Sequence, residues 1–169
     1  MKRHPYTCIL ALEVRYRRFG FAVLEGKPLR LLDSGTRTFA SAGAIFQRLV
    51  PLISTFDPCV IVVRPPAHKQ SFHLNGAKAN LRAIRTEADR RSIRTESVTI
   101  YEVRCLFHER DATKDSIAFR VAQTFPELHW KLPPRRKPWT SEGHNMVIFD
   151  AAATGLSYLA RPDGKGNAP

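Results

Sequence analysis

The sequence predicts a single α/β domain with a five-stranded mixed sheet flanked by helices. Three strand-like runs follow one another before residue 40, and helical periodicities then alternate with further apolar runs. A length of 169 residues suits one domain with one sizeable core. We expect this domain over residues 1–160 and a disordered tail over 161–169.

The first three strands are predicted to form an antiparallel meander. CILALEV at 8–14 is an almost continuous apolar run, which is typical of a strand covered on both faces. A basic stretch at 15–18 separates it from FGFAVLEG at 19–26. A Gly-Lys-Pro turn then leads to LRLLDSGTRTF at 29–39.

A helix and a buried strand are predicted next. Apolar residues recur at helical spacing over 42–56, and Pro51 should kink or split this helix. CVIVVR at 59–64 is rich in β-branched residues, which favour a strand. Pro65 and Pro66 end it.

The rest of the chain adds one strand and three helices. A long helix carries an apolar seam, formed by Leu74, Ala77, Leu81, Ile84 and Ala88. SVTIYEV at 97–103 is the predicted fifth strand, and a helix is expected around 117–122. Ser141 can cap the last helix, which ends at about Ala160.

The strongest compositional feature is the formal net charge of +12, with an isoelectric point near 10.3. Such a surface attracts polyanions, so nucleic acid is the expected partner. A bias toward arginine codons is the alternative explanation. A membrane surface is disfavoured, because the basic residues are scattered and no long amphipathic helix carries bulky apolar anchors.

The three cysteines, Cys8, Cys59 and Cys105, lie in or beside apolar runs and are predicted to be buried thiols. Their odd number and wide spacing support neither a zinc site nor a disulfide framework, which favours a reducing compartment. The N-terminal residues lack the long apolar region of a signal sequence. A cytoplasmic location is therefore expected.

Two carboxylates interrupt apolar segments. Glu13 lies in the first strand and Asp150 in the last helix, where an unpaired buried charge would cost several kcal/mol. Glu13 could instead emerge at a strand end, and Asp150 could lie on an exposed helix face. Together, the two acids suggest a divalent metal site that activates water against a phosphodiester.

Several segments resemble RuvC-type Holliday-junction resolvases. ILALEVRYRRFGFAVLEG is similar to the opening of that family, and LRLLDSGTRTF is similar to its third strand. CVIVVRPP stands where the fourth strand ends in a catalytic Glu, and FDAAATGLSYLA resembles the final helix with its catalytic Asp. The resemblance runs in order from about Ile9 to Ala160. It implies a ribonuclease-H-like fold and a Mg²⁺- or Mn²⁺-dependent endonuclease with Glu13 and Asp150 as catalytic metal ligands.

The sequence departs from the family at these same positions. Glu13 stands in place of the first Asp, and Arg64 stands in place of the fourth-strand Glu. The ligand expected three residues before Asp150 is Val147, and the nearest replacement, His144, lies on a different helical face. Other acids that could rebuild a site are Glu102, Asp111 and Asp115.

Basic residues are the candidates for nucleic-acid contact. Those before residue 115 are Arg15, Arg17, Arg64, Lys69, Lys78, Arg82, Arg85 and Lys114. The irregular segment KLPPRRKPWT at 131–140 adds Arg135, Arg136 and Lys137, with a Trp that could stack on a base. A solvated basic helix face and a solvated proline-rich connection are the respective alternatives.

The expected function is a metal-dependent endonuclease acting on branched or structured DNA. The alternative, which Arg64 favours, keeps the fold but has lost the chemistry, leaving a DNA- or RNA-binding module or a scaffold. A nuclease or processing factor directed at RNA is a third reading. A homodimer through the Leu74 helix is a hypothesis, and Phe72 and His73 either wedge into base stacks or close the core. No GxSxG, Cys–His or phosphate-loop motif supports another hydrolase.

Overall fold

The computed structural model describes residues 8–66, 72–107, 113–135, 137, 139 and 141–161. Its centre is a five-stranded sheet with the order β3-β2-β1-β4-β5. The strands are β1 (Cys8–Val14), β2 (Arg18–Gly26), β3 (Leu29–Thr38), β4 (Val60–Val63) and β5 (Arg94–Ser97). The candidate residues Lys69, Asp111 and Arg136 and the tail from residue 162 lie outside the described residues.

Strand pairing follows the predicted mixed pattern. β2 pairs antiparallel with both β1 and β3, whereas β4 pairs parallel with β1 and with β5. The antiparallel meander is therefore confirmed. Every residue of β1 is buried, as expected for a central strand covered on both faces.

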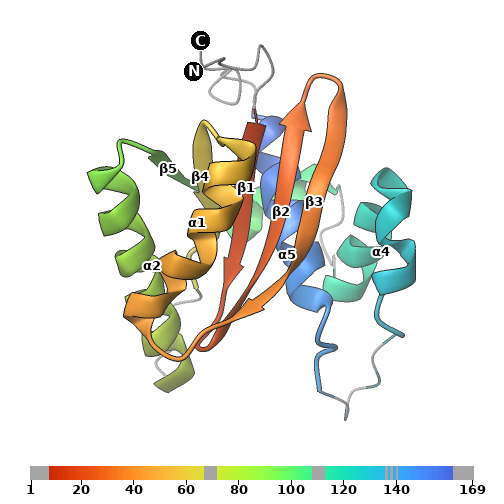
Figure 1. The fold of residues 1–169 in the computed structure, drawn as a ribbon. Helices are drawn as coiled ribbons and strands as arrows, with labels where there is room; N and C mark the ends of the chain where they lie inside the picture. The colour runs from red at the N-terminus through yellow and green to blue at the C-terminus, as the bar shows by residue number, and fades with distance from the viewer. Residues whose placement is uncertain are drawn as a thin grey trace.

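Helices cover the two faces of the sheet, and Figure 1 shows α1 in front of the strands and α5 behind them. One face carries α1 (Ile45–Phe56), after the short helix η1 (Ala42–Ala44), and α2 (Phe72–Arg90). The other face carries α3 (Ile100–Leu106), α4 (Lys114–Thr124), η2 (Pro126–Lys131) and α5 (Met146–Leu159). Alternation along β1 explains the two cores, because Leu10 and Leu12 face α1 and α2 while Ile9 and Ala11 face α5.

The apolar seam of α2 is used inside the domain. Leu81, Ile84 and Ala88 are buried in the core that α1 and the sheet share. This packing is the ordinary role of such a seam. The homodimer therefore stays a hypothesis with no support from this helix face.

The predicted fifth strand is wrong in position. The strand is β5, over Arg94–Ser97, and the run that follows it forms α3. Thr99 caps this helix: Thr99 Oγ1 accepts from the Glu102 backbone N–H at 3.2 Å, and Glu102 Oε2 accepts from the Thr99 backbone N–H at 2.7 Å. This reciprocal capping box outweighs the strand preference of the β-branched residues.

Two expectations about helix boundaries are also corrected. α1 runs from Ile45 through Pro51 to Phe56, so Pro51 does not split the helix, and the expected kink stays a prediction. Pro51 and Gln47 are both exposed, so the carbonyl that loses its partner at Pro51 lies on the solvent side. Ser141 does not cap α5, which begins at Met146 after an N-cap Asn145 that makes no side-chain cap bond.

Burial of the cysteines differs from the prediction. Cys8 is buried, and burial raises the pKa of its thiol to about 11. Cys59 and Cys105 are exposed. Cys59 lies just before β4 begins, and Cys105 lies on the outer side of α3, so neither belongs to a covered strand.

Helix α5 lies unusually close to the sheet. All residues from Met146 to Tyr158 are buried, and a Cβ at Gly20 of β2 would lie 2.2 Å from the Val147 carbonyl oxygen. A Cβ at Gly155 would lie 2.6 Å from Leu24 Cδ1. Glycine at both places allows the close approach that fixes Asp150 against β1 and β2. In the described part of the chain, no helix has the length and hydropathy needed to cross a membrane.

Candidate functional site

The candidate site lies where β1 and β4 end, on the face of the sheet that α5 covers. The parallel register pairs Leu12 with Val63, so the next residues, Glu13 and Arg64, lie side by side. Asp150 reaches the same place from the buried length of α5. The structure therefore brings together the two acids predicted from the sequence, with an arginine between them.

Arg64 bridges the two acids. Its Nη2 lies 2.8 Å from Glu13 Oε2 and 3.4 Å from Asp150 Oδ2. The side chains of Arg64, Glu13 and Asp150 are only 10%, 9% and 5% exposed. We call these three residues the inner layer.

A second set of charges covers the inner layer. Arg15 Nη2 lies 3.2 Å from Glu13 Oε1, 3.1 Å from Asp150 Oδ2 and 3.2 Å from Glu142 Oε1. Lys114 Nζ lies 2.8 Å from Glu142 Oε2 and 3.1 Å from Asp150 Oδ2. Arg15, Lys114 and Glu142 are called the outer layer, and the two layers together the charge cluster. Its three carboxylates and three cations cancel in formal charge.

Burial and pairing shift the pKa values of the inner layer. Burial raises the pKa of Glu13, and the charge of Asp150 raises it further, against the opposing effects of Arg64 and Arg15. Burial alone would lower the pKa of Arg64, but Glu13 and Asp150 together raise it. Arg64 is therefore charged at every accessible pH.

The turn after β1 is held by α2. Asn80 is 2% exposed, and its Nδ2 donates to the carbonyl oxygens of Arg15 at 2.8 Å and Tyr16 at 3.0 Å. A Cβ at Gly76 would lie 2.1 Å from Tyr16 Cδ2, so the tyrosine ring lies directly on the helix. These contacts fix the backbone from which Arg15 reaches the cluster.

A cleft of about 660 Å³ opens above the charge cluster. Basic side chains line it, and they are Arg15, Arg17, Arg18, Arg64, Arg104 and Lys114. Apolar and aromatic residues also line it, among them Tyr16, Pro65, His73, Leu74 and Ile100. The cleft thus offers positive charge beside surfaces on which a sugar or base can lie.

The arrangement does not fit a divalent metal ion. A bound Mg²⁺ would need carboxylate oxygens at about 2.0–2.1 Å. Arg64 Nη2 occupies the space between Glu13 and Asp150 in which an ion shared by both would lie. Among the described residues, no group of three or more His, Cys, Asp or Glu side chains could hold a metal.

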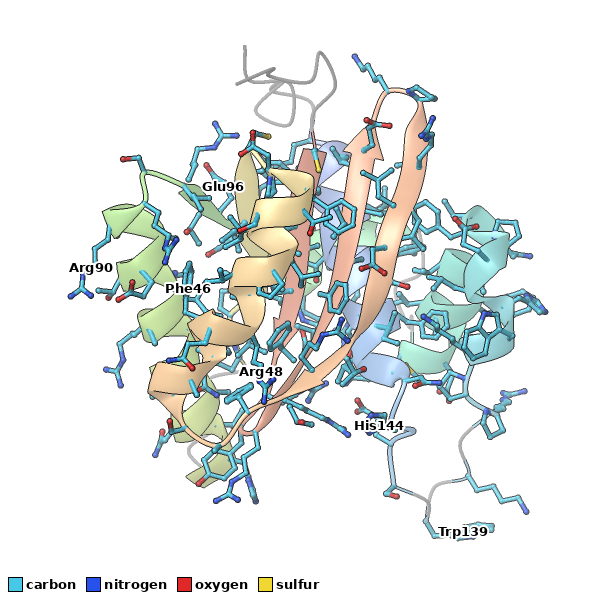
Figure 2. All side chains as sticks on the ribbon, in the orientation of Figure 1. Phe46, Arg48, Arg90, Glu96, Trp139 and His144 are labelled. Carbon is cyan, nitrogen blue, oxygen red and sulfur yellow. The ribbon has the colours of Figure 1, made fainter. Side chains whose placement is uncertain are left out.

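The other predicted ligands lie away from the inner layer. Glu102 belongs to the capping box of α3 and pairs with Arg161. Arg161 Nη2 lies 2.9 Å from Glu102 Oε1. His144 Nδ1 lies 2.9 Å from Arg18 Nη1, and Figure 2 shows His144 on the loop that leads into α5. Asp115 lies in the first turn of α4, and Val147 is buried against Gly20.

The predicted nucleic-acid contacts divide into two groups. Arg15, Arg17, Arg64 and Lys114 line the cleft. The remaining described candidates do not line it, namely Lys78, Arg82, Arg85, Arg135 and Lys137. Arg85 Nη2 donates to Ser97 Oγ at 2.8 Å. Figure 2 shows Trp139 at the tip of the loop before α5, and this residue is 79% exposed.

Sequence reasoning missed Glu142, Arg18 and Arg104. Glu142 lies in a polar loop, where an acid carries no signal of burial or pairing. Arg18 belongs to the basic stretch at 15–18, which did mark this turn. Arg104 comes directly after the segment 97–103 that was predicted as a strand, whereas the structure places it on α3.

Comparisons with known proteins support the fold. No protein-family model and no curated protein matches the sequence. Among solved structures, Thermus thermophilus RuvC in complex with a Holliday junction substrate aligns with a TM-score of 0.67 and 16% identity, over 90% of this chain and 92% of that chain. Another Thermus thermophilus RuvC structure aligns with a TM-score of 0.66 and 19% identity, over 89% of this chain and 92% of that chain.

A third match extends the likeness to a eukaryotic protein. The yeast mitochondrial Holliday junction resolvase Ydc2 aligns with a TM-score of 0.55 and 14% identity, over 89% of this chain and 78% of that chain. The predicted ribonuclease-H-like fold of the RuvC type is therefore confirmed. The inner layer lies at the ends of β1 and β4 and on α5 of that fold.

Proposed function

We propose that this chain is a nucleic-acid-binding protein that uses the cleft above the charge cluster to hold structured DNA. The observation that carries the proposal is the set of six basic residues lining one cleft of a RuvC-type fold. A protein of the same fold is described in complex with a Holliday junction substrate. Four-way junctions are therefore the first ligand to test.

The charges of the cleft suit phosphate groups. Within the described residues, Arg17, Arg18 and Arg104 form no ion pair with a carboxylate, so their charges are available to a ligand. Arginine places several donors in a rigid fork that matches phosphate oxygens. The formal net charge of +12 adds long-range attraction.

Recognition without cleavage is the form of this function that the site favours. Arg64 lies between the two acids that would have to share a metal ion, so we derive no hydrolytic step from them. In the proposed complex, Arg15 and Lys114 contact phosphate at the mouth of the site, while the inner layer holds their positions. A metal-dependent nuclease is the second candidate, and the convergence of Glu13 and Asp150 is the observation that favours it.

The test is binding and cleavage of labelled four-way junctions, DNA duplex and matched RNA duplex, with Mg²⁺, Mn²⁺ or EDTA, beside Asp150→Asn. We expect junction binding in all three conditions, no cuts, and affinity that falls steeply with salt as counterions are released. Metal-dependent cuts that vanish in Asp150→Asn would establish the nuclease instead. A flat salt response would contradict nucleic-acid binding, and tighter binding of the RNA duplex would reassign the ligand.

A further inference from the structure

We infer that Arg64 is a resident cation that takes the place of a divalent metal ion, so that this chain folds and holds its site without metal. Fixed protein charge replaces an exchangeable ligand at this position. The inference concerns the protein without bound nucleic acid and goes beyond the proposed binding of nucleic acid. It can therefore be tested with no nucleic acid present.

The position of the guanidinium is the first argument. One nitrogen, Arg64 Nη2, lies within 3.4 Å of a carboxylate oxygen from β1 and one from α5. A metal ion that bridges Glu13 Oε2 and Asp150 Oδ2 would have to stand at the same point, and Arg15 Nη2 already fills the position between Glu13 Oε1 and Asp150 Oδ2. Arg64 and a bridging metal ion therefore exclude each other.

Charge balance is the second argument. The cluster is neutral as it stands, with three carboxylates and three cations. Adding a divalent ion would leave two uncompensated positive charges next to Arg15 and Lys114, in a place where the inner layer is at most 10% exposed. The electrostatics that draw a metal to a cluster of acids are already satisfied.

The surroundings of Arg64 keep it in place. The four residues of β4 before it are buried, and Pro65 and Pro66 follow it with restricted backbone angles. Its neighbour Glu13 sits on the fully buried strand β1. Arg64 thus directly follows a buried strand, which limits how far the guanidinium can move from Glu13.

Charge reversal at this one residue should convert the site into a metal site. Arg64→Glu would place a third carboxylate beside Glu13 and Asp150 and remove the buried cation between Glu13 Oε2 and Asp150 Oδ2. We expect Arg64→Glu to lower the melting temperature in EDTA by about 10 °C, because buried acids lose their partner. Millimolar Mn²⁺ or Mg²⁺ should restore most of that loss.

The experiment is thermal unfolding of the full chain in EDTA, Mg²⁺ and Mn²⁺, with Mn²⁺ binding measured in parallel by electron paramagnetic resonance. Arg48→Glu is the matched control, since Arg48 is exposed on α1, on the opposite face of the sheet, and Figure 2 labels it there. Arg64→Met removes the charge without adding a ligand. The wild type and Arg48→Glu should show no metal-dependent shift, and Arg64→Met should lose stability that metal does not return.

Two results would overturn the inference. One is stoichiometric Mn²⁺ binding or a raised melting temperature in the wild type that Asp150→Asn abolishes, because the resident cation would then not exclude the ion. The other is a folded Arg64→Glu that binds Mn²⁺ no better than Arg48→Glu. If Arg64→Glu fails to fold, the wild-type titration beside Asp150→Asn decides alone. A failure to bind junctions would contradict the proposed function but would leave these metal titrations unaffected. The two proposals can therefore fail separately.

Discussion

The inner and outer layers of the charge cluster contain the same kinds of groups but differ in exposure. Arg64, Glu13 and Asp150 are 5–10% exposed, whereas Glu142, Arg15 and Lys114 are 23%, 36% and 40% exposed. Breaking a buried pair leaves an uncompensated charge, while exposed pairs contribute about 0–1 kcal/mol. The comparison teaches that the inner layer maintains the fold and the outer layer is available to a ligand.

Removing the inner cation should have the largest effect. Arg64→Met is expected to lower the free energy of unfolding by about 3–5 kcal/mol, because Glu13 and Asp150 lose the buried one of the two cations that they share. Urea unfolding followed by circular dichroism measures it. Adding Glu13→Gln to Arg64→Met should recover part of the loss, and a double variant no more stable than Arg64→Met would show that the two side chains are not coupled.

Removing an outer cation should instead affect the ligand. Arg15→Gln or Lys114→Gln should weaken junction binding about tenfold, since each loses a charge-assisted phosphate contact. Stability should change by about 1 kcal/mol or less. Fluorescence anisotropy at several salt concentrations measures the affinity, and the salt slope should fall by about one.

Arg82→Gln is the control for those variants. Arg82 is exposed on α2 and does not line the cleft, but its loss changes the net charge equally. An equal drop in affinity for Arg82→Gln would mean that general charge, not the cleft, determines binding.

Neutralising the outer acid should strengthen binding. Glu142 engages both Arg15 and Lys114, and its carboxylate stands where a phosphate would meet them. Glu142→Gln should raise junction affinity about threefold to fivefold by freeing both cations. Glu127→Gln, at an exposed acid of η2, carries the same charge change and should have a smaller effect. Equal gains would remove Glu142 from the site.

The smallest expected effect is on the pH dependence of stability. The pKa of Glu13 in the folded chain is raised above its usual 4.5. Between pH 4.5 and the folded-state pKa, the folded state therefore binds more protons than the unfolded state. Stability of the wild type relative to Glu13→Gln should therefore fall as pH rises from 4.5 through the folded-state pKa. Urea unfolding at a series of pH values measures this difference, and a rise with pH would contradict the raised pKa.

The architecture could be predicted from the sequence because apolar periodicity determines it. The buried run of β1, the meander and the convergence of Glu13 with Asp150 all follow from covered strands and helix faces. The position of the fifth strand could not be predicted from β-branched content, since a local capping box at Thr99 reversed the preference. Ser141 was predicted as a cap from its residue type alone, but α5 begins five residues later, at Met146.

The cluster itself was predicted only in part. Arg64 was identified as a departure, but its pairing depends on the parallel register of β4 with β1, which a sequence does not display. Glu142 was missed because it comes from a loop, and only its distance to Arg15 and Lys114 reveals it. Long-range pairing of charges is the information that periodicity lacks.

The two close approaches of α5 to the sheet fix the orientation of this helix at two separate points. Gly20 receives the helix backbone near Val147, and Gly155 receives Leu24, with Asp150 between them. A methyl group at Gly20 would push the N-terminal end of α5 away from the sheet. Asp150 would then move away from its three cations, although no charged residue had been changed. Substitutions at these two glycines should therefore disturb the charge cluster as much as substitutions of its own residues.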